Sequence, residues 1–277
     1  MSIKRIDDAF ARCEKRSALV PYITCGDPSA TGTLEIMHAM VKGGVDIIEL
    51  GMPFSDPMAD GKVIQLAAER ALAKGMTLNG VLDVVKQFRQ DDQETPVVLM
   101  GYANPIEAMG WEKFTQSASQ AGVDGVLVVD FPPEEFDDVS AYYEAADLAP
   151  IFLIAPTSTD ERIKKVGEIA KGYVYYVSLK GVTGSAALDT EDVKEKVQNI
   201  KRFVNIPVGV GFGIQDVESA RAIASVADAV VIGSKLINTM QSAIEGHAEE
   251  QHNQLAANSA GEWLASIRQG LETVTKE

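Results

Sequence analysis

Residues 44–48, Gly44-Val45-Asp46-Ile47-Ile48, place an aspartate between the end of a helical pattern and the start of an apolar run. The same arrangement recurs at Gly122-Val123-Asp124-Gly125-Val126 and at Val226-Ala227-Asp228-Ala229-Val230. By the order of the apolar runs, these aspartates introduce the second, fourth and eighth predicted strands. Asp46 and Asp228 are therefore six units and 228 − 46 = 182 residues apart. A unit of about 30 residues is the size of one strand-plus-helix repeat.

Eight short apolar runs, each followed by a loop and a helical pattern, predict a parallel sheet covered by helices. The predicted strands are Leu19–Thr24, Asp46–Leu50, Val97–Gly101, Gly125–Val129, Ile151–Ala155, Val174–Val177, Pro207–Val210 and Ala229–Ile232. Predicted helices include Val63–Lys74, Trp111–Ala121, Asp160–Ala170 and Asp216–Ala224. Eight such units favour a closed (β/α)8 barrel, the TIM barrel, over an open doubly wound sheet. Without a linker-like segment, we expect residues 1–277 to form a single domain.

Helical periodicity extends beyond the repeats at both ends of the chain. An extra N-terminal helix is predicted by the apolar steps at Ile3, Ile6, Phe10 and Cys13. The C-terminal segment repeats the step at Leu264, Ile267, Leu271 and Val274. Ser158, with Glu161 three residues later, has the spacing of a capping box for the helix that begins near Asp160.

The composition excludes several classes of protein. The chain has 25 Lys+Arg against 40 Asp+Glu, a formal charge of −15, which opposes binding to nucleic acid and to anionic membrane surfaces. No apolar run approaches the roughly 20 residues of a membrane-spanning helix, and the charged N-terminus does not resemble a secretory signal. The two cysteines, Cys13 and Cys25, suggest free thiols in a reducing compartment. We therefore expect a cytoplasmic protein.

Catalytic groups in such barrels lie at the carboxyl ends of the strands, which directs attention first to Glu49. Glu49 shares a strand face with Ile47, so a buried carboxyl group is expected, although a Glu that ends the strand and points to solvent remains an alternative. The loop that follows is long for this kind of connection and contains two prolines and a second carboxylate, Asp60. Taken alone, an aspartate such as Asp60 is more often a helix cap than a catalytic residue.

Glycines follow the last two predicted strands, at Gly211-Phe212-Gly213 and at Gly233-Ser234. Backbone N–H groups at these two positions form the phosphate site common in TIM barrels. The glycine spacing lacks the third glycine of a dinucleotide fingerprint. The Gly-containing loop after the sixth strand is either a mobile lid or a plain connection.

The positions of the lysines and histidines further limit the reactions that this chain could catalyse. No predicted strand contains a lysine for a Schiff base, and the histidines lie in predicted helices away from the strand ends, without the ligand spacing of a zinc site. Lysine-based and zinc-based aldolase chemistry are therefore disfavoured. Acid–base catalysis by carboxylates on a small phosphate ester remains.

Four motifs together resemble the tryptophan synthase alpha subunit family, and the resemblance covers nearly the whole chain. They are Glu49 with Gly51-x-Pro53-Phe54-Ser55-Asp56-Pro57-x-Ala59-Asp60-Gly61, Met100-Gly101-Tyr102-Ala103-Asn104-Pro105, Gly181-Val182-Thr183-Gly184 and Gly211-Phe212-Gly213-Ile214. The resemblance implies cleavage of indole-3-glycerol phosphate to indole and glyceraldehyde 3-phosphate. No cofactor is then expected in this chain, because C3-protonated indole itself serves as the electron sink.

The resemblance also implies roles for individual residues. Glu49 is expected to be the general acid–base, Asp60 to accept a hydrogen bond from the indole N–H, and Tyr175 to lie near Glu49. Thr183 is expected to orient Asp60. The phosphate cradle would comprise Gly184, Gly213, Gly233 and Ser234, with Phe212 beside it. The indole pocket would be lined by Tyr22, Met100, Leu127 and Leu153.

The family assembles with a separate beta subunit, which uses pyridoxal phosphate, into an alpha2beta2 heterotetramer. The resemblance implies that the partner is faced by the loops that carry Pro53, Asp56, Pro57, Asn104 and Pro132. Several positions depart from the common family pattern: Tyr22 stands where Phe is frequent, Leu153 where Ile is frequent, Met52 and Met58 where Val and Leu are usual, and Lys62 where Pro is common. A stand-alone indole-releasing lyase, a catalytically silent barrel that acts as a binding partner, and a phosphosugar isomerase remain alternatives.

Overall fold

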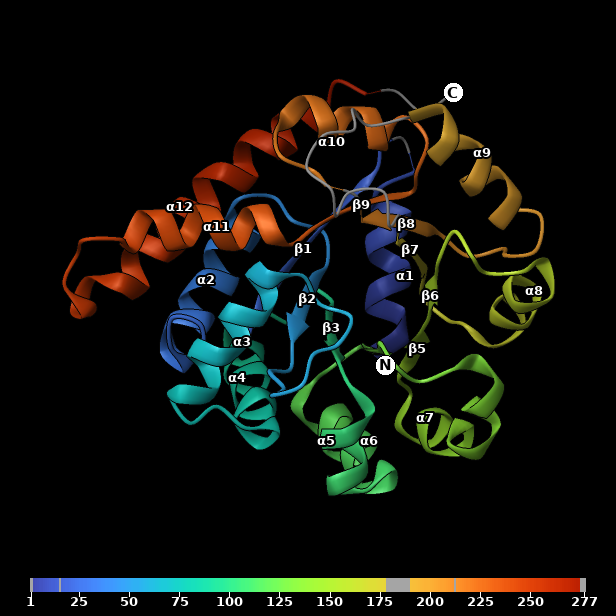
Figure 1. Cartoon of the computed structure of the whole chain (residues 1–277), viewed down its shortest axis with the longest axis horizontal. Helices are drawn as coiled ribbons and strands as arrows, with labels where there is room; N and C mark the ends of the chain where they lie inside the picture. The colour runs from blue at the N-terminus through green and yellow to red at the C-terminus, as the bar shows by residue number, and fades with distance from the viewer. Residues whose placement is uncertain (1, 15, 178–189, 212, 275–277) are drawn as a thin grey trace.

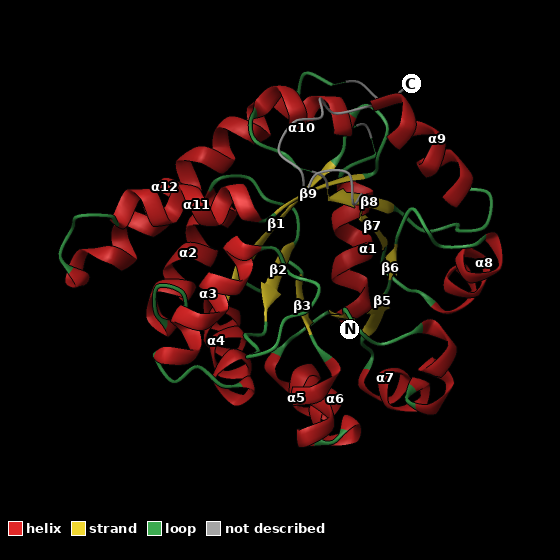
Figure 2. Cartoon of the chain, viewed as in Figure 1, coloured by secondary structure: helices red, strands yellow, loops and turns green. Residues whose placement is uncertain are grey.

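The computed structural model describes residues 2–14, 16–177, 190–211 and 213–274. Nine parallel strands curl into a nearly closed barrel that is ringed by helices (Figures 1 and 2). The strands are β1 Ala18–Thr24, β2 Ile48–Gly51, β3 Val97–Gly101, β4 Gly125–Val128, β5 Ala149–Ile151, β6 Leu153–Ile154, β7 Val174–Val177, β8 Val208–Gly211 and β9 Ala229–Ile232. The helices are α1 Ser2–Arg12, α2 Ala30–Lys42, α3 Lys62–Ala73, α4 Leu78–Asp91, α5 Ala103–Met109, α6 Trp111–Ala121, the 3-10 helix η1 Pro133–Asp138, α7 Ser140–Ala146, α8 Asp160–Ile169, α9 Thr190–Ile200, α10 Val217–Ala224, α11 Ser234–Ile244 and α12 Glu249–Leu271. None of these helices is long and apolar enough to cross a membrane.

The predicted TIM barrel and its extra N-terminal helix are confirmed, but one predicted strand is wrong in its extent. The run Ile151–Ala155 is not continuous: the chain forms β5 and β6, separated by Phe152. The strand order is β5-β4-β3-β2-β1-β9-β8-β7-β6, so β5 pairs with β4 and β6 pairs with β7. The interruption therefore lies where the barrel closes, and there the Tyr175 N–H donates to the Phe152 carbonyl at 3.0 Å.

Two smaller predictions about local structure are also wrong. Ser158 and Glu161 do not form a capping box, because Thr159 is the N-cap of α8 and its hydroxyl accepts from the Arg162 N–H. The Ser158 hydroxyl instead accepts from the Ala155 N–H at 3.0 Å and closes the preceding loop. His247 lies between α11 and α12 rather than within a helix.

Strand alternation divides the apolar residues into two cores. Side chains that face out from the strands pack beneath the surrounding helices, whereas those that face in fill the barrel. The inner core includes Ile6 and Ala9 of α1, which crosses the centre of the ring of strands in Figure 1. The Phe10 ring lies 5.8 Å from that of Tyr173, between centroids. The extra helix thus closes the amino-terminal end of the barrel and leaves the carboxyl end open for a site.

The repeated aspartates that predicted the fold share one structural task. Each carboxylate accepts a hydrogen bond from a backbone N–H at the start of the preceding strand. The pairs are Leu19 with Asp46 at 2.8 Å, Val97 with Asp124 at 2.8 Å and Val208 with Asp228 at 2.9 Å. Asp124 is fully buried and also pairs with Arg5 and Arg89, each at 2.7 Å. These contacts fix neighbouring strands and the plugging helix to one another.

Candidate active site

Glu49 lies in the centre of β2 and is completely buried. Its register partner on β1 is Tyr22, and its partner on β3 is Val98. Ile47, two residues earlier, belongs to the inner core, so Glu49 also points into the barrel. The solvent-facing alternative for Glu49 is therefore excluded.

The surroundings of the Glu49 carboxyl group favour its protonated form. The Tyr173 hydroxyl donates to Oε1 at 2.5 Å, and Oε2 has no hydrogen-bond partner among the described residues. Burial raises the pKa of Glu49 to about 8, and the Tyr173 hydrogen bond lowers it only in part. At neutral pH this carboxyl group is mostly protonated and can donate a proton, which is the property required of a general acid.

Asp60 lies near the end of the loop between β2 and α3 and is only half-buried. Burial raises its pKa to about 6, and a hydrogen bond from the Tyr102 hydroxyl lowers it in part. The same hydroxyl accepts from the Ala59 N–H at 3.1 Å, which ties the loop to the residue that follows β3. At neutral pH, Asp60 is therefore the ionised carboxylate of the site and Glu49 the neutral one.

Tyr22 lies near both carboxyl groups. Burial raises the pKa of Tyr22, and the negative charges of Asp60 and Glu49 raise it further. Both groups therefore lie close enough to Tyr22 to act on it electrostatically. Tyr175 on β7 is likewise affected by the charge of Glu49, so the two side chains lie near each other.

The apolar residues predicted for the pocket also face the barrel. Met100, Leu127 and Leu153 all contact the inner core, on β3, β4 and β6. Met100 and Leu127 are register partners on neighbouring strands, and Leu153 is the register partner of Tyr175. These positions form an apolar wall that continues from the buried carboxyl group toward the carboxyl end of the barrel.

The predicted phosphate cradle is described in part. Gly213 has φ +37°, and Gly233 is the N-cap of α11 with no side-chain capping bond, so the first N–H groups of α11, beginning with Ser234, are not used by a capping side chain. By contrast, the side chain of Asp216 caps α10. Of these two helix N-termini, that of α11 is therefore the better binding site for an anion. Thr183, Gly184 and Phe212 lie outside the described residues.

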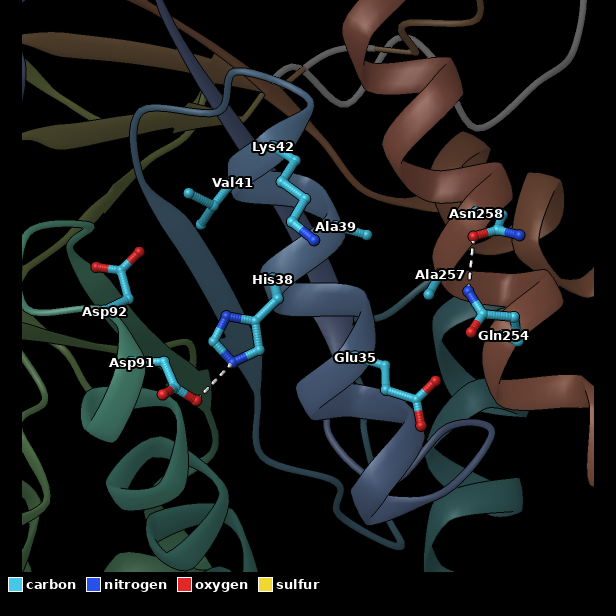
Figure 3. Close-up of a pocket in the computed structure, with 10 residues that line it drawn as sticks. All are labelled: Glu35, His38, Ala39, Val41, Lys42, Asp91, Asp92, Gln254, Ala257 and Asn258. Carbon is cyan, nitrogen blue, oxygen red and sulfur yellow. Dashed lines mark hydrogen bonds and ion pairs between the residues drawn. The ribbon is translucent and has the colours of Figure 1, made fainter.

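A separate surface groove lies between α2, α4 and α12, outside the ring of strands (Figure 3). Its contacts are ordinary surface ones: His38 Nε2 lies 3.9 Å from Asp91 Oδ2, and Gln254 donates to Asn258 at 2.7 Å. Its lining comprises Glu35, His38, Ala39, Val41, Lys42, Asp91, Asp92, Gln254, Ala257 and Asn258. None of the predicted site residues belongs to it.

None of the nine described strands contains a lysine, in agreement with the sequence analysis. The described residues also include no cluster of three or more His, Cys, Asp or Glu side chains that could hold a metal ion. The described residues of the candidate site include two carboxyl groups of opposite protonation, Glu49 and Asp60, and the phenols around them.

Comparison with known proteins decides the family. The family profile described as "Tryptophan synthase alpha chain" matches residues 9–266. The chain belongs to the tryptophan synthase alpha chain family. The tryptophan synthase alpha chain of Bordetella bronchiseptica is 58% identical over 99% of this chain and 97% of its own length. That of Burkholderia mallei is 56% identical over 99% of both chains. The crystal structure of the alpha subunit from Legionella pneumophila str. Paris covers 98% of this chain and 99% of its own, at 43% identity and a TM-score of 0.89.

Two residues that hold the carboxyl groups were not predicted from the sequence of this family member. Tyr173 donates to Glu49 and Tyr102 to Asp60. A signal for Tyr173 was present, because it alternates with Tyr175 and so shares its inward face. No comparable signal pointed to Tyr102, since its contact depends on how the Asp60 loop folds back over the end of β3.

Proposed function

We propose that this chain cleaves indole-3-glycerol phosphate to indole and glyceraldehyde 3-phosphate, as the carbon–carbon lyase subunit of a tryptophan synthase. The observation that carries the proposal is the pair of carboxyl groups at one barrel mouth, with Glu49 held protonated up to about pH 8 and Asp60 ionised above about pH 6. The membership of the chain in the tryptophan synthase alpha chain family supports the choice of substrate.

The two carboxyl groups divide the reaction between them. Glu49 donates its proton to C3 of the indole ring, which places positive charge on the ring nitrogen. Asp60 accepts a hydrogen bond from the ring N–H and stabilises that charge. The glycerol hydroxyl on the adjacent carbon then returns a proton to Glu49 while the carbon–carbon bond breaks. The electron pair of the broken carbon–carbon bond neutralises the positive charge on the ring. Indole and an aldehyde then leave, and Glu49 is again protonated.

The remaining predicted residues divide by the part of the substrate they contact. The aromatic ring lies against Tyr22, Met100, Leu127 and Leu153, with Tyr175 next to Glu49. The phosphate is bound by Gly184, Gly213, Gly233 and Ser234, beside Phe212, and Thr183 orients Asp60. The negative phosphate group can bind despite the net charge of −15, because backbone N–H groups at the start of α11 make a locally favourable site for an anion.

A tryptophan synthase beta subunit is the proposed partner, in an alpha2beta2 heterotetramer. The β2–α3 loop supports a docking surface, because Met58 is 78% exposed there and Leu66 on α3 is 41% exposed. Pro53, Asp56 and Pro57 belong to this loop, whereas Asn104 lies in the first turn of α5 and Pro132 directly precedes η1. Pyridoxal phosphate is proposed to bind only the beta subunit. We place the complex in the cytoplasm, consistent with two cysteines that are both free and buried.

The experiment is an indole-release assay on the purified chain, with and without a beta subunit. We expect turnover by the wild-type chain that rises strongly with the partner, and a loss of at least 100-fold in both Glu49→Gln and Asp60→Asn. Full activity without a partner would favour the stand-alone lyase. No indole release under either condition would favour a silent barrel, and near-full turnover by either variant would refute its assigned role.

A further inference from the structure

The hydroxyl group of Tyr22 reaches the carboxyl end of the barrel. Tyr22 and Thr24 share one face of β1, and Thr24 is the register partner of Gly51, the last residue of β2. The Tyr22 hydroxyl lies 3.4 Å from Thr24 Oγ1, and a Cβ added at Gly51 would lie only 2.1 Å from it. The side chain thus leans two residues along its own strand, so the hydroxyl rather than only the ring lies at the mouth.

This hydroxyl group is buried but poorly satisfied. Tyr22 is 8% exposed and Thr24 is 2% exposed. Hydroxyl–hydroxyl bonds are usually near 2.7–2.8 Å, so the contact of 3.4 Å with Thr24 is weak. A phenol can donate one hydrogen bond and accept others, and leaving it unpaired in an apolar pocket is unfavourable. The Tyr22 hydroxyl therefore has unused capacity to bond a ligand.

The environment keeps this hydroxyl group neutral. Burial raises the pKa of Tyr22, and the charges of Asp60 and Glu49 act in the same direction. The phenol can thus both donate and accept at any pH at which the enzyme works. The wall beyond it is apolar, since Met100, Leu127 and Leu153 contact the inner core. The Tyr22 hydroxyl is therefore a neutral polar group that borders the apolar wall of the pocket.

We propose that Tyr22 is a specificity-determining residue whose hydroxyl favours aromatic rings bearing a hydroxyl or amino group over the unsubstituted ring. The proposal rests on the function proposed above, in which Tyr22 lines the pocket for the indole ring. An unsubstituted ring covers the phenol with C–H groups and leaves it unpaired. A polar substituent within reach supplies the missing bond. One neutral hydrogen bond corresponds to a preference of about fivefold.

The test runs the reaction in reverse, by condensing glyceraldehyde 3-phosphate with indole or with 4-, 5-, 6- or 7-hydroxyindole. The measured quantity is the ratio of kcat/KM for each hydroxyindole to kcat/KM for indole. Tyr22→Phe removes only the hydroxyl group and should lower the ratio for the best isomer about fivefold. Thr24→Val removes the weak internal partner and should leave that ratio equal or higher. Tyr142→Phe, at an exposed tyrosine of α7, is the matched control and should keep the wild-type ratios.

The outcomes separate the two proposals. If the wild-type chain does not condense indole at all, the proposed function fails. If it condenses indole, the inference about Tyr22 is overturned in two cases: when no hydroxyindole is a substrate, or when all four ratios in Tyr22→Phe stay within twofold of wild type. Circular dichroism of each variant confirms that the compared chains are folded.

Discussion

Replacing Glu49 by Gln should stabilise the folded chain, and increasingly so as the pH rises. The pKa of Glu49 is about 8 in the folded chain against an ordinary value of 4.5. The folded state therefore binds the proton more tightly than the unfolded state. That contribution to stability is complete below pH 4.5 and is lost progressively as the pH rises to about 8. Gln mimics the protonated acid, can still accept from Tyr173 and does not titrate.

The size of the effect follows from 1.36 kcal/mol for each pKa unit. With pKa values of about 8 and 4.5, ionisable Glu49 costs the folded chain about 1 kcal/mol at pH 5, about 3 kcal/mol at pH 7 and about 5 kcal/mol at pH 9. Such a cost, retained for a proton donor, is the exchange of stability for function expected at an active site. The Glu49→Gln variant should be more stable than wild type by these amounts.

The assay is the free energy of unfolding in urea, measured for both chains from pH 5 to pH 9. Glu144→Gln is the control, because Glu144 is an exposed carboxyl group on α7, and its curve should follow that of wild type. Parallel curves for Glu49→Gln and wild type over the whole range would show that Glu49 is not a perturbed acid, and the reasoning would be refuted.

Two further predictions concern the scaffold. Asp124→Ala removes a buried acceptor that bonds the Val97 N–H and pairs with two arginines, and it should cost about 3–5 kcal/mol in urea unfolding. Asp83→Ala, on the exposed side of α4, should cost less than about 0.5 kcal/mol, and a loss below about 1 kcal/mol in Asp124→Ala would contradict the role of the aspartate. Lys62→Pro places proline at the first position of α3, after a Gly61 whose ψ of 160° suits it, and should stabilise by about 0.5–1 kcal/mol by calorimetry. Lys62→Ala separates loss of charge from the effect of the ring, and a destabilised proline variant would show the backbone is not preorganised there.

The repeat of aspartates allowed the fold to be predicted because the same local need recurs at each site. The sequence placed Asp46, Asp124 and Asp228 before strands, and the structure gives each one a backbone N–H of the preceding strand. Those partners could not be predicted, since they lie about 20–30 residues away in sequence and depend on the register of the sheet. For the same reason the interruption at Phe152 was missed: it depends on which neighbour each half of the strand meets when the barrel closes.

The candidate site, like the fold, could be predicted from the sequence only in part. Strand alternation predicted a buried Glu49 but left a solvent-facing side chain as an alternative, which the structure excludes. The hydrogen bond that holds its carboxyl group comes from Tyr173, 124 residues later, and the one that reaches Asp60 comes from Tyr102. Motifs identify which residues carry chemistry, whereas their protonation is decided by burial and by partners from distant strands.

The most direct test of the central claim is the dependence of kcat/KM for indole release on pH, measured with the beta subunit present. A buried Glu49 that must be protonated in the free enzyme predicts activity that stays high through neutral pH and falls above about pH 8, tenfold for each further pH unit. Activity that already declines from about pH 4.5, or that persists undiminished to pH 10, would contradict a neutral Glu49 as the proton donor.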